Sequence, residues 1–319
     1  MRAKLLIALT LALIAAPVHA QNYPARPIKL VVPFAAGGPG DTVARLLAQA
    51  MSKGQTVVVE NVSGAGGNIG ATYVSRAAPD GYTLLFHQLG MAISPFLYSK
   101  LEYDPLDFET IGMVAYQANV LITRPNMVPG TFQDFLSYLK TNHEKLSFAS
   151  TGPGGASDLC AILFKNATGI DIKTVPYRAT APALTDILGG NVDLLCDSVA
   201  TATPYIQAGS VQAHGVTTLT RASSLPDVPT LDEQGLKGFD MTTWTSLYAP
   251  KGTPRPVVDH LSKSLQDAVQ DPQFIASLQK VGSSAQPKER ATPEAHAAYL
   301  RQEISRWGPI IKAAKIRAD

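Results

Sequence analysis

Hydrophobic positions along the chain alternate between short continuous runs and runs spaced as on one face of a helix. The segment Ile28–Phe34 is apolar and rich in β-branched residues, which is typical of a buried strand. The next segment predicts an amphipathic helix, because apolar residues recur at helical spacing: Val43, Leu46, Leu47, Ala50 and Met51. Further strands are predicted over Thr56–Asn61 and Thr83–His87, with a helix over 68–78 between them. This βαβαβ order predicts a parallel sheet with helices on both faces.

The middle of the chain repeats this order, and the C-terminal part is helical. Strands are predicted over 145–151, 170–177, 191–197 and 211–218, and helices over 132–140, 157–167 and 182–190. A loop entering a short helix is predicted over 224–235. Helical pattern over 254–282 is interrupted at Pro272, and Thr292 with Pro293 predicts the start of the last helix. The predicted class is therefore α/β with two similar halves.

The first twenty residues have the pattern of a secretory signal peptide. Arg2 and Lys4 precede an apolar run from Leu5 to Ala16, and small residues lead up to Ala20. The apolar run is shorter than a membrane span, and no lipobox cysteine follows it. We therefore expect residues 1–20 to be cleaved and the rest of the chain to be exported and released.

The net charge of the chain bears on its binding partners, and its two cysteines bear on a disulfide. Of the 27 basic residues two belong to the signal peptide, which leaves 25 against 25 acidic residues. A formally neutral chain gives no electrostatic basis for binding nucleic acid or an anionic membrane. Cys160 and Cys196 are an even pair in an exported protein, which favours a disulfide, and two buried free thiols are the alternative.

Signatures of common enzymes and metal sites are missing from the sequence. It contains no Gly-x-Ser-x-Gly and no His-Glu-x-x-His, and its histidines lack metal-ligand spacing. We therefore expect no catalytic residue, metal or cofactor. His87 ends a strand and is a candidate to line a ligand site, whereas His143, His296 and Glu303 are expected at the solvated surface.

Three glycine-rich turns lie where a predicted strand leads into a helix, at 35–42, 63–68 and 150–157. A helix N-terminus presents unpaired N–H groups and the positive end of the helix dipole, and glycine lets a ligand approach the backbone. The turns lack the Walker lysine and a complete dinucleotide fingerprint. They are therefore candidates to bind a small anion such as a carboxylate. For any one turn, the alternative is a helix entrance that merely needs room.

From Tyr23 to the last helix the chain resembles the solute receptors of tripartite tricarboxylate transporters, the Bug family. The resemblance rests on these stretches in order: "YPARPIKLVVPFAAGGPGD", "VENVSGAGGNIGA", "AAPDGYTLL", "YDPLDFE", "VPYRATAPALTDILGGNVDLLCD", "LPDVPT" and "YAPKGTP". It implies a type II-like, two-lobe periplasmic binding protein fold. Each lobe would be a mixed, mostly parallel sheet flanked by helices, and two crossing strands, 119–125 and 242–250, would join them. Lobe 1 would comprise 21–122 and 243–319, and lobe 2 would comprise 123–242.

The resemblance also implies a function. A monomeric receptor in the periplasm of a Gram-negative bacterium would close its lobes on a small organic acid, a dicarboxylate, aliphatic or aromatic. It would deliver that acid to the permease subunits of a tripartite tricarboxylate transporter, without a cofactor and without enzymatic activity. A receptor that signals to a sensor kinase, and an exported hydrolase on the same two-lobe fold, are the alternatives.

Candidate ligand-binding residues lie in both predicted lobes. The first lobe contributes Phe34, Ala35, Gly37, Gly38, Asp41, Gly64, Gly66, Gly67 and His87. The second lobe contributes Ser150, Thr151, Gly152, Gly154, Ala156, Ser157, Asp158, Tyr177, Arg178 and Asp197.

Some of these candidates leave alternatives open. Asp158 stands where the family usually has histidine, and Ala179 stands where it usually has glycine. Asp158 either caps its helix or places near the ligand a carboxylate that repels a second ligand carboxylate or attracts an amine. Arg178 either binds a carboxylate or pairs with Asp186. Asp41 either caps its helix or orients a water against the ligand.

Overall fold

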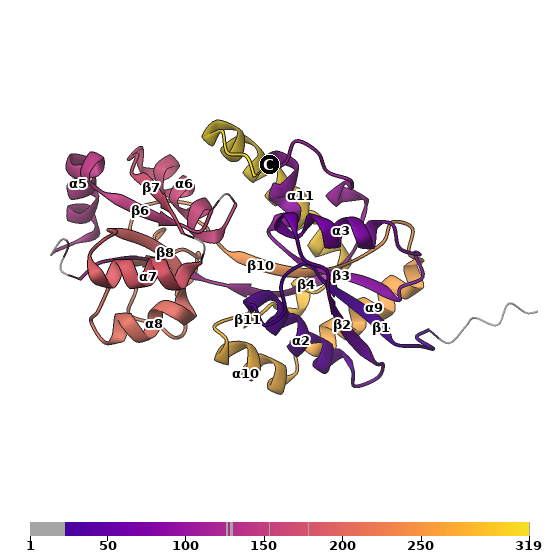
Figure 1. Ribbon diagram of the computed structural model, residues 1–319. Coiled ribbons are helices and arrows are strands. Elements are labelled where there is room, and N and C mark those ends of the chain that lie inside the picture. The colour runs from indigo at the N-terminus through magenta and orange to yellow at the C-terminus, as the bar shows by residue number, and fades with distance from the viewer. Residues whose placement is uncertain (1–22, 126, 128–129, 153, 178, 319) are drawn as a thin grey trace, which may run out of the picture.

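The computed structural model describes residues 23–125, 127, 130–152, 154–177 and 179–318 as two sheets flanked by helices (Figure 1). The predicted signal peptide and Arg178 lie outside the described residues. The strands are β1 (Ile28–Val32), β2 (Val57–Asn61), β3 (Thr83–Gln88), β4 (Glu109–Gln117), β5 (Asn119–Thr123), β6 (Ser147–Ser150), β7 (Lys173–Pro176), β8 (Leu194–Ser198), β9 (Gln212–Val216), β10 (Thr243–Ala249) and β11 (Ser284–Ala285).

Helices cover both faces of each sheet. They are α2 (Pro39–Met51), α3 (Asn68–Ser75), α4 (Gly90–Leu97), α5 (Phe132–Asn142), α6 (Ala156–Thr168), α7 (Thr180–Gly189), α8 (Val199–Gln207), α9 (Arg255–Val269), α10 (Pro272–Lys280) and α11 (Pro293–Ala314). Within the described part of the chain, none of these helices is long and apolar enough to cross a membrane.

The strands form a six-stranded sheet, in the order β11-β4-β10-β3-β1-β2, and a five-stranded sheet, in the order β7-β6-β8-β5-β9. We call each sheet with its helices lobe 1 and lobe 2, respectively. Both sheets are mixed, as predicted. Parallel pairs are not in the majority, however, since β4, β10 and β11 pair antiparallel in lobe 1 and β5 runs against β8 and β9 in lobe 2.

The chain crosses from lobe 1 to lobe 2 just before strand β5 and returns to lobe 1 just before strand β10 (Figure 1). Strand β5 follows β4 across a single residue, Ala118, and Asn119 already pairs with Ser198 in lobe 2. The return ends at Thr243, which pairs with Gln117 in lobe 1. Strand β5 thus belongs to the sheet of lobe 2 and β10 to the sheet of lobe 1, so the passages themselves are the short stretches before these two strands.

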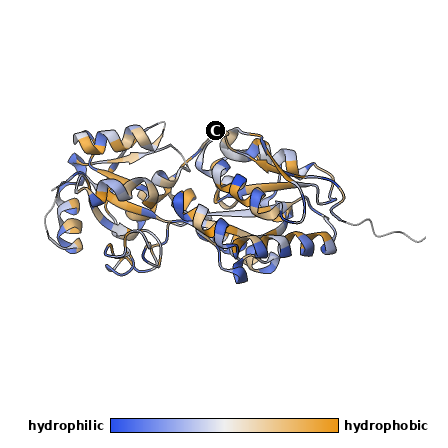
Figure 2. Cartoon of the chain, turned by 90° about the horizontal axis from the view of Figure 1, so that it is seen from below, coloured by the Kyte–Doolittle hydropathy of each residue, from blue (hydrophilic) through white to orange (hydrophobic). Residues whose placement is uncertain are grey.

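Alternation along the strands divides the core of each lobe into two layers. In β1, Leu30 and Val32 pack toward α2, α9 and α10, whereas Val31 packs toward α3, α4 and α11. All three side chains are fully buried, which explains the continuous apolar run, because a strand covered on both faces has no polar side. Figure 2 shows the same concentration of hydrophobic residues along the strands of both lobes. Each such side chain contributes roughly 1.5–3 kcal/mol on burial.

Helix α11 buries two polar residues that the sequence predicted at the surface. His296, Glu303 and Trp307 lie on one face of the helix, at spacings of seven and four residues, and all three are buried. The Glu303 carboxylate accepts N–H hydrogen bonds from the indoles of Trp244 and Trp307, at 3.3 and 3.1 Å. His296 packs edge-on against Tyr248, with ring centroids 4.5 Å apart. The prediction of solvated positions is therefore wrong for both residues.

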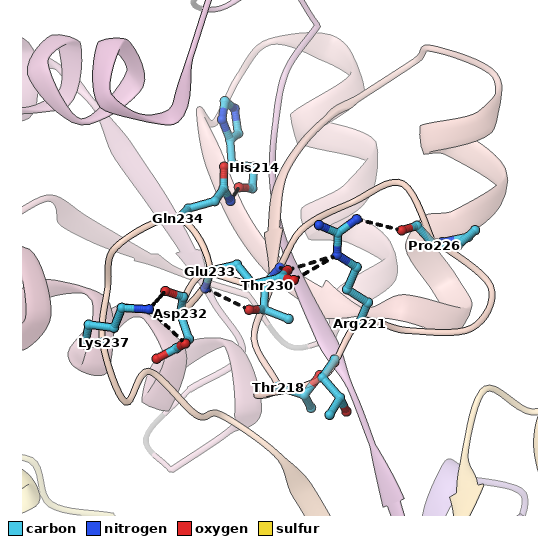
Figure 3. A network of polar contacts seen from close by, with 10 residues as sticks. His214, Thr218, Arg221, Pro226, Thr230, Asp232, Glu233, Gln234 and Lys237 are labelled. Carbon is cyan, nitrogen blue, oxygen red and sulfur yellow. Dashed lines mark hydrogen bonds and ion pairs between the residues drawn. The ribbon is translucent and has the colours of Figure 1, made fainter.

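The loop predicted over 224–235 is present, but turns stabilised by polar contacts replace the short helix that it was expected to enter (Figure 3). Thr230 and Glu233 exchange the two hydrogen bonds of a capping box, as the start of a helix would require. Arg221 binds the same Glu233 carboxylate at 2.9 Å and the Pro226 carbonyl at 3.0 Å. Gly235 then follows within a turn, so the local signal for a helix start is present but no helix continues from it.

Candidate functional site

A cleft of about 570 Å³ lies between the two lobes. Lobe 1 lines it with the turn before α2 and with the ends of β3, β4 and β10. Lobe 2 lines it with the N-terminal ends of α6, α7 and α8 and with the end of β8. Four helix N-termini therefore meet at one cleft, where their dipoles favour negative charge.

The glycine turns before α2 and α6 have the same local structure. In lobe 1 the Gly37 N–H donates to the Asp41 carboxylate at 2.8 Å, and in lobe 2 the Gly154 N–H donates to the Asp158 carboxylate at 3.1 Å. Both glycines have positive φ, +80° and +76°, a conformation that other residues rarely adopt. The two lobes thus present equivalent turns to the cleft from opposite sides.

Neither turn uses a side chain to cap its helix. Gly38 is the N-cap of α2 and Gly155 is the N-cap of α6, and no described side chain accepts a hydrogen bond from the first N–H groups at either end. Helix α7 also begins at an N-cap, Ala179, without a side-chain hydrogen bond. No capping oxygen among the described side chains accepts a hydrogen bond from the first N–H groups of these helices. These N–H groups are therefore available to donate to an anion.

Charged side chains are almost absent from the cleft. Among the described residues that line it there is no lysine, arginine or histidine, and Asp197 is the one carboxylate. Hydroxyl groups are common, and Thr151, Ser157 and Thr180 belong to the lobe 2 wall. Among the described lining residues, the groups that favour an anion are therefore backbone N–H groups and helix dipoles.

Asp197 is buried, with 3% of its surface exposed. Its Oδ1 accepts the Ser198 N–H at 2.7 Å, whereas its Oδ2 has no hydrogen-bond partner among the described residues. Burial raises the pKa of Asp197 to about 6, against the opposing effect of the Ser198 N–H.

Asp41 and Asp158 serve their own turns and do not line the cleft. Burial alone would raise the pKa of Asp41, but hydrogen bonds from Arg45, the Gly37 N–H and Asn61 outweigh it and lower the pKa to about 2. For Asp158, burial prevails and raises its pKa despite the Gly154 N–H and a 3.0 Å hydrogen bond from the Ser150 hydroxyl. Each carboxylate accepts the N–H of a glycine that precedes the N-cap, so it holds the turn in place and leaves the first N–H groups of the helix uncapped.

The predicted site residues divide into three groups. Those that line the cleft are Phe34, Ala35, Gly37, Gly38, Thr151, Ala156, Ser157 and Asp197. Gly66 and Gly154 line an adjoining hollow of about 330 Å³, which shares Phe34, Thr151 and Ala156 with the cleft. Residues placed in neither lining are Asp41, Gly64, Gly67, His87, Ser150, Gly152, Asp158 and Tyr177. Arg178 cannot be placed, because it lies outside the described residues.

The third glycine turn, 63–68, accommodates neighbouring side chains. A Cβ atom on Gly67 would lie 2.7 Å from Nε2 of His87, and one on Gly66 would lie 2.5 Å from the Tyr98 hydroxyl oxygen. His87 is fully buried, and burial lowers its pKa to about 4. For this turn the geometry therefore favours the helix entrance that needs room, with His87 as a structural residue.

Tyr177 is directed toward a carboxylate of its own lobe. Its hydroxyl donates to Asp186 at 2.7 Å, and Asn191 also binds that carboxylate, at 3.2 Å. Asp186, the partner predicted for Arg178, is thus already engaged by two neighbours.

Sequence reasoning missed a set of polar residues at strand ends and in first helical turns. They are Gln88, Gln117, Asn119, Thr180, Thr201 and Thr243. The Gln117 amide of β4 donates to the Ser198 hydroxyl at 3.2 Å, so it connects the lobes beside the cleft. A signal was available, because ligands of open α/β sheets bind beyond the carboxyl ends of strands.

The predicted disulfide between Cys160 and Cys196 is confirmed, which excludes two free thiols. It joins α6 to β8, with 6.3 Å between the Cα atoms. Cys160 follows the lobe 2 glycine turn and Cys196 precedes Asp197. The bond therefore ties together two parts of the lobe 2 wall of the cleft.

Residues 43–316 match the profile of the family described as the tripartite tricarboxylate transporter family receptor. The chain belongs to this family. It is 43% identical over 296 residues to a protein encoded in the ttuE–ttuC′ intergenic region of Agrobacterium vitis, covering 92% of this chain and 86% of that one. It is 33% identical over 304 residues to BugT of Bordetella pertussis, covering 94% and 92%.

Solved structures agree with this assignment. The periplasmic binding protein BugD is 45% identical, with a TM-score of 0.75, over 92% of this chain and 99% of that one. MatC from Rhodopseudomonas palustris, solved with malate, is 36% identical, with a TM-score of 0.74, over 91% and 100%. A protein of R. palustris solved with adipate is 32% identical, with a TM-score of 0.76, over 93% and 99%. The chain therefore has the α/β fold of the Bug-type periplasmic receptors.

Proposed function

We propose that this receptor captures a small dicarboxylate between its lobes and delivers it to a tripartite tricarboxylate-type permease in the membrane. The observation that carries the proposal is the pair of equivalent, uncapped glycine turns that face one cleft from both lobes. The relatives solved with malate and with adipate support the choice of a dicarboxylate.

The cleft suits carboxylates through backbone groups. Each turn offers N–H donors and a helix N-terminus, and a favourable charge–dipole interaction is worth about 0.3–1 kcal/mol per helix end. A dicarboxylate would place one carboxylate at each turn, with the hydroxyls of Thr151 and Ser157 as further donors in lobe 2. These groups bind and orient the ligand, and the proposal involves no chemical step.

Closure of the lobes around the ligand completes the proposed binding cycle. The lobes are linked through the short passages before β5 and β10, and such connections can act as hinges. A ligand held by both turns would stabilise the closed form, since it contacts both lobes only when they approach. The closed form would then be the one that the permease recognises in the periplasm, after cleavage near Ala20.

A thermal-shift screen of the mature protein tests the ligand class. The panel should contain aliphatic and aromatic mono-, di- and tricarboxylates, including malate and adipate. A ligand that binds only the native state raises the melting temperature, so we expect the largest shifts with dicarboxylates. No shift with any carboxylate would contradict the proposal, and isothermal titration calorimetry on the best ligands would give their affinities.

Gly38→Val tests the role of the first turn. Gly38 has a negative φ of −77°, and a Cβ atom there would lie no closer than 3.4 Å to its neighbours, so valine fits the fold. Its methyl groups would obstruct the helix end, and we expect affinity for the best dicarboxylate to fall at least about tenfold, a loss of about 1.4 kcal/mol. Calorimetric titration measures the loss.

Gly54→Val is the matched control. Gly54 is exposed in the turn after α2, and nothing lies within 4 Å of a Cβ atom placed there. It should bind as the wild type does. Full affinity in Gly38→Val would show that the first turn is only a helix entrance.

Gly154→Val is a poor test of the second turn. That glycine has positive φ, and a Cβ atom there would lie 2.6 Å from the Leu97 side chain, so the substitution would destabilise the fold itself.

Uptake measurements test the proposed partner. In cells that use the identified dicarboxylate, deletion of this gene should abolish its high-affinity uptake. Wild-type protein should restore uptake and Gly38→Val should not. Unchanged uptake in the deletion strain, with binding intact in the purified protein, would contradict delivery to a transporter.

A further inference from the structure

Asp197 is unusual among the residues of the cleft. It is the one carboxylate among the described lining residues, and it is buried. The Ser198 N–H holds its Oδ1, and its Oδ2 has no hydrogen-bond partner in the described chain. A buried polar atom without a partner is costly, so such an atom in a ligand cleft points to a hydrogen bond that forms on binding.

A bound dicarboxylate would bring further negative charge to this residue. Two like charges about 4 Å apart repel by about 4 kcal/mol at an effective dielectric constant near 20. A cation next to Asp197 would relieve the repulsion, but no lysine, arginine or histidine is present among the described residues that line the cleft. Uptake of a proton by the carboxylate itself would neutralise it without such a cation.

We propose that Asp197 takes up one proton from solvent when a dicarboxylate binds, and that its Oδ2–H then donates a hydrogen bond to the bound ligand. The proposal rests on the dicarboxylate function proposed above. Oδ1 keeps the Ser198 N–H, so Oδ2 is the oxygen that receives the proton. No covalent bond of the ligand changes.

The elements around Asp197 carry few other titratable groups among the described residues. On β5, the opposite residue is the apolar Val120, and on β8 the preceding residue is the disulfide-bonded Cys196. On β4 the titratable group that lines the cleft is the phenol of Tyr116, and on α6 Asp158 is engaged by its own turn. The N-terminus of α8 favours the ionised carboxylate and burial favours the neutral acid.

These opposing effects leave the free receptor poised for proton uptake. With a pKa of about 6, Asp197 is mostly ionised at pH 7.5 and must gain nearly a whole proton to become neutral. Affinity for malate or adipate should therefore rise as the pH falls, by up to about tenfold per pH unit between pH 8 and pH 6.5.

Isothermal titration calorimetry measures the proton directly. Malate and adipate are titrated into the mature protein at each pH in two buffers that are effective there and whose ionisation enthalpies differ, such as phosphate and Tris at pH 7.5 and phosphate and Bis-Tris at pH 6. At pH 7.5 we expect uptake of close to one proton per ligand, falling to about half a proton at pH 6. The same titrations from pH 6.5 to 8 give the pH dependence of the affinity.

Two variants assign the proton to this residue. Asp197→Asn supplies a neutral donor of similar shape, so it should bind at pH 7.5 at least as tightly as wild type, with no proton uptake and an affinity that no longer changes with pH. Asp171→Asn is the matched control, because Asp171 is an exposed lobe 2 carboxylate paired with Lys165. It should keep the wild-type proton uptake.

The outcomes separate this inference from the proposed function. Binding without proton uptake in the wild type would overturn the role of Asp197 and leave the dicarboxylate receptor standing. Persistent uptake in Asp197→Asn would also overturn it. Tight binding of an amino dicarboxylate without proton uptake would show that Asp197 stays ionised and binds an ammonium group. Absence of binding by any carboxylate would overturn the proposed function and this inference together. If Asp197→Asn fails to fold, the wild-type proton counts at pH 7.5 and pH 6 decide.

Discussion

Asp41 and Asp158 show how one side chain shapes each glycine turn. Each lies in the first turn of its helix and accepts the N–H of the positive-φ glycine four residues before it. The family usually has histidine at position 158, but here the second turn repeats the chemistry of the first. Asp158 therefore stabilises its turn, and the hypothesis that it repels or attracts a ligand group loses its geometric basis.

Asp41→Ala should lower the free energy of unfolding by about 1.5–3 kcal/mol, because a buried, charged acceptor of hydrogen bonds is lost. The folded-state pKa of Asp41, about 2, is below its ordinary value of 3.8. Its stabilisation is therefore present above pH 4 and is lost as the pH falls toward 2. Urea denaturation at pH 7 measures the difference.

The control for this experiment is Asp259→Ala, which removes an exposed ion pair with Arg255 on α9. Surface pairs of this kind contribute little, so its unfolding free energy should change by less than about 1 kcal/mol. Equal effects in the two variants would show that the Asp41 network does not stabilise the turn.

At the scale of elements, the disulfide fixes α6 against β8. It closes a loop with a sequence separation of 36 residues, for which the loss of chain entropy in the unfolded state is worth about 3–4 kcal/mol. Cys160→Ala with Cys196→Ala should lower the free energy of unfolding by about that amount, measured by urea denaturation. Affinity for the dicarboxylate should weaken less than in Gly38→Val, because both turns remain. Unchanged stability would show that α6 and β8 are held by packing alone.

Elements with a strong local pattern could be predicted from the sequence, whereas two short helices that contain a proline could not. Strands β1 and β3 and helices α2 and α11 follow from apolar periodicity and caps. Helices α4 and α8 were missed, because each is short and contains a proline, Pro95 and Pro204, which normally argues against a helix interior. Packing against the rest of the fold holds both in place: α4 lies mainly against α11, and α8 lies against β5, β8 and β9.

The candidate site was predictable to the same extent. The glycine turns are local features, so Gly38 and Ser157 could be identified from the residues around them and from the family resemblance. Strand ends are a general signal, but it does not single out Gln117, Asn119 and Thr243. They reach the cleft through the pairing of β4 with β10, at positions more than a hundred residues apart, and of β5 with β8. The burial of Glu303 likewise depends on a partner from another strand, Trp244.

At the scale of the whole molecule, three buried histidines couple the fold to pH. Burial lowers the pKa of His87 and His214 to about 4 and that of His296 to about 3, from an ordinary value of 6.5. His214 is stacked on Phe135, with ring centroids 3.6 Å apart, and bonds Thr123 at 2.9 Å. Both nitrogens of His296 lack a partner among the described residues. A charge on any of these rings would be poorly solvated.

Whether stability rises or falls with pH depends on whether the folded or the unfolded chain binds more protons. Below about pH 6.5 the unfolded chain protonates these histidines while the folded chain keeps them neutral, so stability falls as the pH falls. The loss continues until the pH reaches the folded-state pKa values, near 4 and 3. Asp197 and Asp158 have the opposite sign, because a raised pKa of a carboxyl group favours the folded state on acidification, but they are two groups against three.

Urea denaturation at pH 7, 6 and 5 should therefore show falling stability, with up to about 1.4 kcal/mol per pH unit from each histidine. His296→Met should flatten the dependence, since methionine fills an irregular apolar space and takes up no proton. His260→Gln is the control, because His260 is exposed and its loss should leave the dependence unchanged. Equal stability at pH 7 and pH 5 would contradict the assignment. If both pH effects hold, mild acid strengthens dicarboxylate binding through Asp197 and destabilises the ligand-free protein through the histidines. The increase in melting temperature on adding the ligand should therefore be largest at the pH where the free protein is least stable.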